Sequence, residues 1–90
     1  MVRYFGTAKG RVQGVGFRFF VQGNAEDLGI TGWVMNMHDG SVTMELQGEP
    51  EAVDELQKRI EAGNRFIRVD SFSLEERTVQ SNETGFHIRS

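Results

Sequence analysis

The chain has 90 residues, enough for one small hydrophobic core and too few for two, so we expect a single domain over residues 1–90. It contains no cysteine, which excludes a disulfide framework and a cysteine-ligated metal site. Ten Lys and Arg against thirteen Asp and Glu give a net charge of −3, which argues against binding nucleic acid through many phosphate contacts.

Residues 1–11 contain charged residues and glycines and no apolar run of the kind typical of a signal peptide. No stretch approaches the roughly 20 apolar residues of a membrane span. Together with the absence of cysteine, this predicts a mature cytoplasmic protein without membrane contact. Residues 2–9, VRYFGTAK, predict a strand with Tyr4, Gly6 and Ala8 on one face. If Gly6 and Ala8 face the core, their small size lets a helix approach this strand closely.

A glycine-rich stretch, GRVQGVGFR at residues 10–18, leads from this strand into a helix. The apolar residues at helical spacing are Phe17, Val21, Ala25 and Leu28. We expect this helix to end at Gly29. Gly23 inside it costs about 1 kcal/mol relative to alanine, so packing or the needs of the preceding loop should outweigh helix propensity there.

Two strands joined by a turn come next, at residues 30–36 and 41–47. The second strand alternates cleanly, with Val42, Met44 and Leu46 on one face. Asp39-Gly40 between the strands is a strong hairpin signal because both residues tolerate positive φ.

The last third of the chain predicts a helix and two strands. Residues 50–63, PEAVDELQKRIEAG, form a helix that Pro50 opens and Gly63 ends. A strand then starts near Val69, with a turn or bulge before Phe72 because the two residues are out of phase. Residues 78–85 are a polar loop, and residues 86–90, FHIRS, predict a short strand at a sheet edge.

This order predicts an α+β fold, the ferredoxin-like βαββαβ sandwich, with two helices on one face of a mainly antiparallel sheet and a short extra C-terminal strand. In that topology the first and second strands run parallel with the third between them. Their carboxyl ends open at one edge, roughly 10 Å apart at a strand spacing of about 4.8 Å. The glycine-rich loop and Asn36 therefore meet at this edge.

The loop at this edge predicts a cradle for an anion. Backbone amides point outward where a strand leads into a helix N-terminus, and the helix dipole favours negative charge there. Gly10, Gly14 and Gly16 let the backbone come close to the anion, and the planar fork of Arg18 suits a phosphoryl or carboxylate group. The spacing matches neither GxxxxGK[ST] nor GxGxxG, so mononucleotide binding by those routes is not expected. The alternative is that the glycines only make a tight turn, with Arg18 solvated and Asn36 a turn former.

Other candidate chemistry is sparse. His38 and His87 lie far apart in the sequence and are typical of surface residues rather than ligands or bases. The carboxylates lie on the second helix or on late strands, where a solvated face is the ordinary interpretation. The four methionines and Trp33 are interpreted as core residues.

The two motifs together resemble the signatures of the acylphosphatase family. GRVQGVGFR resembles the family's phosphate-binding signature, and GWVMN at residues 32–36, followed by Gly40, Val42 and Gly48, resembles its second signature. The resemblance also includes Ala25 and Leu28-Gly29 and covers essentially the whole chain. Ala8 departs from the larger aliphatic residue usual in the family, and we expect looser packing there without loss of activity.

The resemblance implies an enzyme that hydrolyses the carboxyl–phosphate bond of acyl phosphates to a carboxylate and inorganic phosphate, with no metal and no cofactor. It implies that Arg18 binds the phosphoryl group and that Asn36 holds the attacking water. The cradle amides would come from Gln13, Gly14, Val15, Gly16 and Phe17. We expect a monomer whose partner is the small acyl phosphate alone.

Two further hypotheses are kept open. The first is a non-catalytic anion-binding or regulatory module of the same fold. The second is a catalytic domain severed from a larger carbamoyl-phosphate-using maturation protein, which the 90-residue length disfavours. RNA binding, which this fold also hosts, is not expected because no basic face with exposed aromatics is present.

Overall fold

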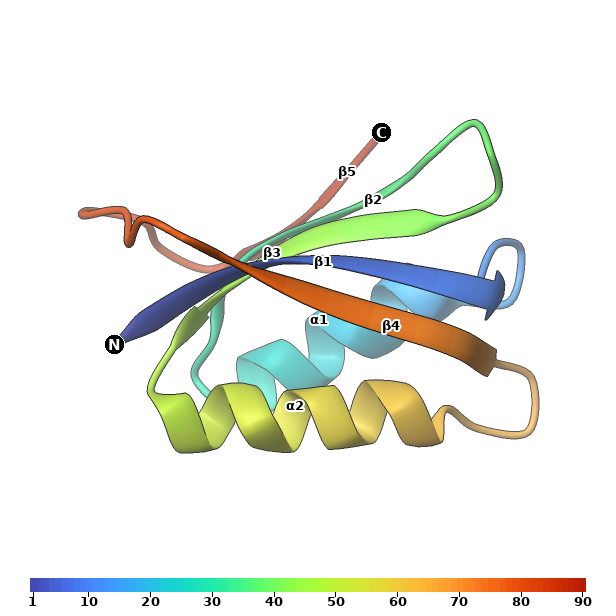
Figure 1. Ribbon diagram of the computed structural model, residues 1–90, viewed down its shortest axis with the longest axis horizontal. Helices are drawn as coiled ribbons and strands as arrows, with labels where there is room; N and C mark the ends of the chain where they lie inside the picture. The colour runs from blue at the N-terminus through green and yellow to red at the C-terminus, as the bar shows by residue number, and fades with distance from the viewer.

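Five strands and two helices make up the computed structural model, which describes residues 1–90 (Figure 1). The elements are β1 (Val2–Arg11), α1 (Phe17–Asp27), β2 (Thr31–Asn36), β3 (Val42–Gly48), α2 (Pro50–Ala62), β4 (Arg68–Arg77) and β5 (Phe86–Arg89). Every predicted element is present, and β1 extends to Arg11 instead of Lys9. Neither helix is long and apolar enough to cross a membrane.

The strands form one sheet in the order β4-β1-β3-β2-β5. β1 pairs antiparallel with β3 and β4, β2 pairs antiparallel with β3, and β5 pairs parallel with β2. Both helices cover the same face of the sheet (Figure 1). This confirms the predicted ferredoxin-like sandwich, because β3 separates the parallel strands β1 and β2 and β5 adds the short edge strand.

The hydrophobic core lies between this face and the helices. Its central strand is β3, where Val42, Met44 and Leu46 are fully buried, as the alternation predicts. The helices contribute three buried residues each: Phe17, Val21 and Ala25 from α1, and Val53, Leu56 and Ile60 from α2. Burying one such aliphatic side chain stabilises the fold by about 1.5–3 kcal/mol, so this single core carries most of the stability.

Two glycines of β1 serve the sheet itself. At Gly6 a Cβ would lie 3.1 Å from Met44 and 3.1 Å from Phe72, so side chains of the neighbouring strands fill the space predicted for a helix. Gly10 lies opposite a bulge: Lys9 pairs with Ser71 and Gly10 with Val69, which leaves Asp70 unpaired. The bulge confirms the irregularity predicted before Phe72.

Gly10 has φ of +134°, and a Cβ there would lie 2.3 Å from the carbonyl oxygen of Arg68. The close approach of β4, rather than the predicted cradle, therefore explains why residue 10 is a glycine. Ala8 is fully buried, and the looser packing expected around it stays a prediction.

Only one of the four methionines belongs to the core, contrary to prediction. Met44 is buried, Met35 is half-buried, and Met1 and Met37 are 66% and 37% exposed. Trp33 is half-buried on the face away from the helices, where the Arg89 guanidinium lies 4.7 Å from its ring centroid. Methionine and tryptophan are thus used largely at the surface of this small domain.

A buried arginine occupies the face away from the helices. Arg3 is 1% exposed, and its Nε donates to Glu45 at 2.6 Å while its Nη atoms donate to the carboxylate of Glu83 at 2.8 and 3.1 Å. Arg3 also donates to Gln47 at 3.0 Å, and Thr31 donates to Glu83 at 2.7 Å. The predicted polar loop after β4 is therefore tied down on this face through Glu83.

Candidate active site

The loop between β1 and α1 meets the end of β2 at one edge of the sheet. Asn36 is the last residue of β2. The Gln13 side chain joins the two segments, because its Nε2 donates hydrogen bonds to the carbonyl oxygens of Met37 at 2.7 Å and Ser41 at 2.9 Å. These carbonyls flank the turn that follows Asn36. The Gln13 side chain therefore fixes the β1–α1 loop against the end of β2, where Asn36 lies.

The backbone amides of this loop are free to bind a ligand. None of the amides of residues 13–16 donates to a backbone carbonyl. Gly14 and Gly16 adopt φ of 74° and 78°, which favours glycine, and the space where each Cβ would project is open. Successive amides in such left-handed turns form concavities that bind anions.

The N-terminus of α1 adds its dipole to the same concavity. Gly16 caps the helix without a side-chain hydrogen bond, and the first turn contains no acidic residue. The first amides of a helix have no acceptor within it, so those that follow Gly16 remain available. Phe17 is 1% exposed, and its ring stacks on that of Phe20 with the ring centroids 6.5 Å apart. This packing fixes the first turn in the core.

Arg18 projects from that turn with its charge uncompensated. Its Nη1 donates to the carbonyl oxygen of Arg89 at 3.1 Å, and it forms no ion pair with a carboxylate. Arg89 pairs in register with Met35, the neighbour of Asn36. The contact with β5 therefore holds the guanidinium toward the end of β2 and leaves most of its five N–H donors free.

Asn36 carries an unsatisfied acceptor. Its Oδ1 is the one buried side-chain polar atom of the structure without a hydrogen-bond partner. A buried acceptor left without a partner costs about 1–3 kcal/mol, so this position favours a bound molecule that donates a hydrogen bond. A hollow of about 440 Å³ lies beside it, lined by Met35, Met37, His38 and Ser90.

The turn after Asn36 joins β2 and β3 as the predicted hairpin. Gly40 has φ of 92°, but Asp39 keeps a negative φ. Its Oδ1 accepts from the hydroxyl of Ser41 at 2.6 Å and from the Ser41 amide at 2.9 Å, and these bonds lower the pKa of Asp39. The Asp39 side chain therefore stabilises the turn between Asn36 and Val42, in which only Gly40 is in the left-handed region.

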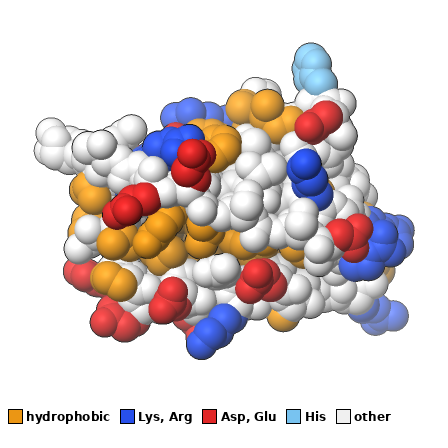
Figure 2. Space-filling view, in the orientation of Figure 1, with side chains coloured by type: hydrophobic (Ala, Val, Ile, Leu, Met, Phe, Trp, Pro, Cys, Tyr) orange, Lys and Arg blue, Asp and Glu red, His pale blue; other side chains and the backbone are white.

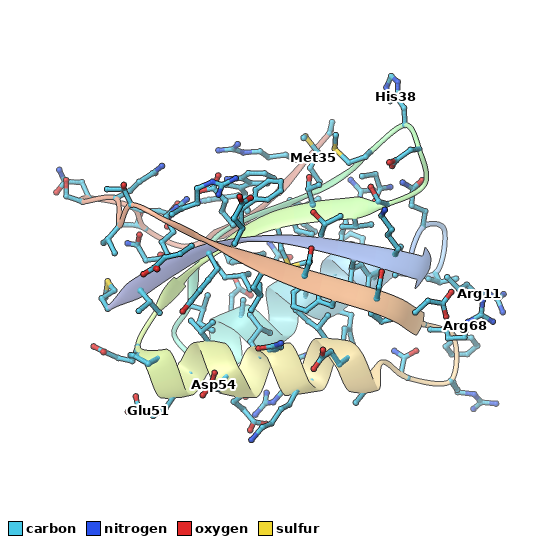
Figure 3. All side chains as sticks on the ribbon, viewed as in Figure 1. Arg11, Met35, His38, Glu51, Asp54 and Arg68 are labelled. Carbon is cyan, nitrogen blue, oxygen red and sulfur yellow. The ribbon has the colours of Figure 1, made fainter.

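The structure brings the predicted loop residues 13–18 and Asn36 to one edge. Of the other polar candidates, His38 lines the hollow beside Asn36. His38 projects into solvent at the tip of the β2–β3 turn (Figure 3), and His87 is also exposed. No group of three His, Cys, Asp or Glu side chains is placed to hold a metal ion. The motif predicted a role only for the backbone amide of Gln13. Its side-chain bridge depends on the position of the β2–β3 turn, and the contact between Arg18 and Arg89 depends on the pairing of β5 with β2.

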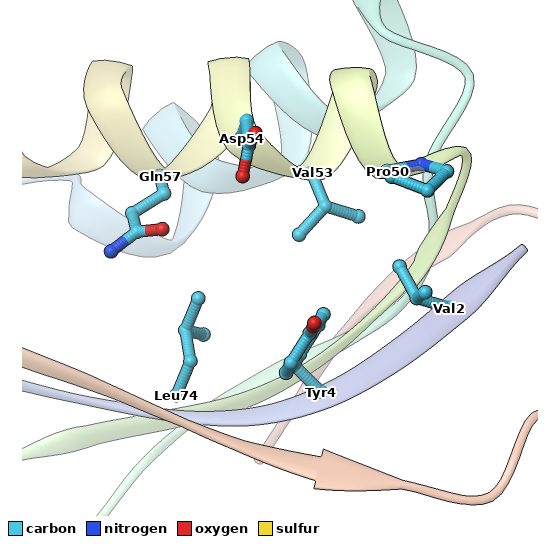
Figure 4. Close-up of a pocket in the computed structure, with 7 residues that line it drawn as sticks. All are labelled: Val2, Tyr4, Pro50, Val53, Asp54, Gln57 and Leu74. Carbon is cyan, nitrogen blue, oxygen red and sulfur yellow. The ribbon is translucent and has the colours of Figure 1, made fainter.

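A separate hollow of about 360 Å³ lies where β1 begins, at the end of the sheet opposite the loop. Val2, Tyr4 and Leu74 from the sheet face Pro50, Val53, Asp54 and Gln57 of α2 across it (Figure 4). Asp54 is its one charged side chain. This hollow lacks the convergent polar groups of the loop and Asn36, so the other end is the better candidate for an active site.

Known proteins resemble the whole chain. The Acylphosphatase family matches residues 4–88. The acylphosphatase of Geobacillus thermodenitrificans (strain NG80-2) is 47% identical over 88 residues, which cover 98% of this chain and 94% of that protein. The crystal structure of acylphosphatase from Bacillus subtilis covers 100% of both chains with a TM-score of 0.94 and 34% identity. The T. kodakarensis HypF structure matches 100% of this chain over 12% of its own, with a TM-score of 0.87 and 26% identity.

Proposed function

The chain belongs to the acylphosphatase family of enzymes, and we propose that it hydrolyses the carboxyl–phosphate bond of small acyl phosphates without a metal ion. Arg18 and the amides of residues 13–17 bind the phosphoryl group, and Asn36 orients the attacking water. Residues 1–90 form one catalytic domain that acts as a monomer. The observation that carries this proposal is the unpartnered Oδ1 of Asn36 at the same edge as a loop of unpaired amides.

The cradle supplies the charge stabilisation that phosphoryl transfer needs. Charge spreads over the three equatorial oxygens of the phosphoryl group in the transition state, and fixed donors around them lower the barrier. The amides of residues 13–17 and the Arg18 guanidinium are donors of this kind. The glycines leave no side chain between these donors and the phosphoryl oxygens.

Asn36 places the nucleophile. A water that donates to its Oδ1 keeps a lone pair free to attack the phosphorus. The water oxygen bonds to phosphorus while the bridging P–O bond breaks, and the electron pair of that bond leaves on the carboxylate. The water proton passes to a phosphoryl oxygen of the substrate. Because a carboxylate is a good leaving group, this reaction needs no general acid.

The test is an assay of phosphate release from acetyl phosphate and benzoyl phosphate in excess chelator, with a phosphate monoester as the control substrate. We expect rapid turnover of both acyl phosphates and none of the monoester. Loss of turnover in chelator would contradict metal independence. Tight binding of inorganic phosphate without turnover would favour the anion-binding module instead.

A further inference from the structure

A second basic feature lies at the same end of β1 as the cradle. A hollow of about 400 Å³ opens between the end of β1 and the connection from α2 to β4. Arg11, Arg65 and Arg68 line it together with Phe66, which is 58% exposed. Arg11 and Arg68 are direct partners across the β1–β4 pairing, and Figure 3 shows them together at this end of the sheet. We call this hollow the arginine pocket.

The charge of the arginine pocket is opposite to that of the molecule. Arg11 pairs with no carboxylate, and the Arg65 guanidinium lies 5.2 Å from the ring centroid of Phe66 without an acidic partner. Arg68 pairs with Asp70 at 3.0 Å, and Glu61 is the one acidic lining residue. Blue side chains gather at the same end of the molecule in Figure 2, although the net charge is −3. The pocket is therefore a local attractor for anions.

The proposed reaction sends the leaving group toward this pocket. Across the sheet, the order β4-β1-β3-β2 places the loop after β1 between the end of β2 and the start of β4. The attacking and leaving oxygens of a phosphoryl transfer lie in line on opposite sides of the phosphorus. With water held by Asn36 on the β2 side, the acyl group leaves on the side of β4. Arg11, which lines the arginine pocket, precedes Gln13 of the cradle by two positions in the sequence.

We propose that the arginine pocket is the acyl-group subsite and that it selects acyl groups bearing a second negative charge. This rests on the proposed function, since the direction of departure depends on the water at Asn36. The substrate class is an acyl phosphate whose acyl chain ends in a carboxylate or a phosphate. Arg11 and Arg65 meet that anion, because neither is neutralised by an acidic side chain.

The test compares two substrates of equal carbon count, monosuccinyl phosphate and butyryl phosphate, which differ in a terminal carboxylate. We expect the wild-type kcat/KM for monosuccinyl phosphate to exceed that for butyryl phosphate at low ionic strength. The ratio of kcat/KM for monosuccinyl phosphate to kcat/KM for butyryl phosphate should fall about twofold to fivefold in Arg65→Gln, which is the range of a solvent-exposed ion pair. In the double variant Arg11→Gln with Arg65→Gln it should fall about tenfold. Glu61→Gln changes the ratio in the opposite direction because it removes the acidic lining residue.

The control is Arg77→Gln, which removes the same charge at the other end of β4, where Arg77 lies over the Phe5 ring. It leaves the ratio at the wild-type value. A ratio that stays the same in the Arg11 and Arg65 variants, while butyryl phosphate is still hydrolysed, overturns the subsite and leaves the proposed function standing. Failure of the wild type to hydrolyse either substrate overturns both.

Discussion

At Asn36 a substitution can separate an effect on catalysis from an effect on stability. Its side chain forms no hydrogen bond within the protein, and its Oδ1 is buried without a partner. An asparagine that served only the hairpin would be satisfied by the turn, as Asp39 is by Ser41. Removing Asn36 should therefore affect catalysis and leave folding intact.

We predict that Asn36→Ala lowers kcat about a hundredfold with little change in KM, since water is positioned only for the chemical step. The midpoint of thermal unfolding should stay the same or rise, because no intramolecular hydrogen bond is lost. Arg18→Lys is the contrasting variant: a point charge replaces the planar fork, so KM rises as kcat falls. Steady-state kinetics on benzoyl phosphate and thermal melts measure both, and near-full turnover by Asn36→Ala would refute the water-holding role.

At the scale of the elements, α1 contains one residue that nothing in the structure explains. Gly23 is exposed, has no positive φ, and has no atom within 4 Å of the position of a Cβ. Packing therefore does not account for this glycine, and the alternative that the preceding loop requires it stays a prediction. Gly29, just beyond the same helix, has equally open surroundings but φ of 70°.

This contrast gives a matched pair of substitutions. Gly23→Ala should raise the free energy of unfolding by about 0.5–1 kcal/mol, because alanine loses less backbone entropy in a helix. Gly29→Ala should lower it by about 1 kcal/mol, because alanine is strained in the left-handed region. Urea denaturation measures both variants. A loss of stability in Gly23→Ala would mean that the glycine has a role in the helix that open space does not show.

The elements were predictable because their signals are local, whereas the contacts between them were not. Helical spacing and the Pro50 and Gly63 boundaries set α2, and alternation set β3. The edge shared by the loop and Asn36 followed from topology alone. The side-chain bridge of Gln13 could not be predicted, because its acceptors are carbonyls on the far side of the β2–β3 turn. Gly10 was assigned to the cradle because the sequence does not show how closely β4 approaches it.

For the molecule as a whole, the face of the sheet away from the helices depends on one ionic network. Arg3 in β1, Glu45 in β3 and Glu83 in the loop before β5 are distant in sequence, and Arg3 and Glu83 are 80 positions apart. Truncating one partner of a buried ion pair leaves the other charge uncompensated and destabilises the fold. The network also fixes the loop that leads into β5, the strand that holds Arg18 through Arg89.

Stability should consequently depend on pH through Glu83. Burial alone raises the pKa of the Glu83 carboxyl, but hydrogen bonds from Arg3 and Thr31, together with the Arg3 charge, outweigh it and hold this pKa below its usual range. A depressed folded-state pKa contributes stability above the unfolded value of about 4.3, and that stability is lost as pH falls through the folded pKa. Arg3 stays charged throughout, since its hydrogen bond with Glu83 raises its pKa.

We predict that Glu83→Gln lowers the free energy of unfolding by about 1–3 kcal/mol at pH 7, because the charge that compensates Arg3 is lost. The difference in the free energy of unfolding between variant and wild type should narrow as pH falls from the unfolded value of about 4.3 through the lower folded pKa, where the wild-type carboxyl also becomes neutral. Urea denaturation at neutral and acid pH measures this difference. Glu76→Gln, an exposed carboxylate of β4 outside every ion pair, is the matched control and should show no such difference. If the difference in the free energy of unfolding between Glu83→Gln and wild type stays constant from neutral to acid pH, shape and hydrogen bonding, rather than charge, hold this loop on the sheet.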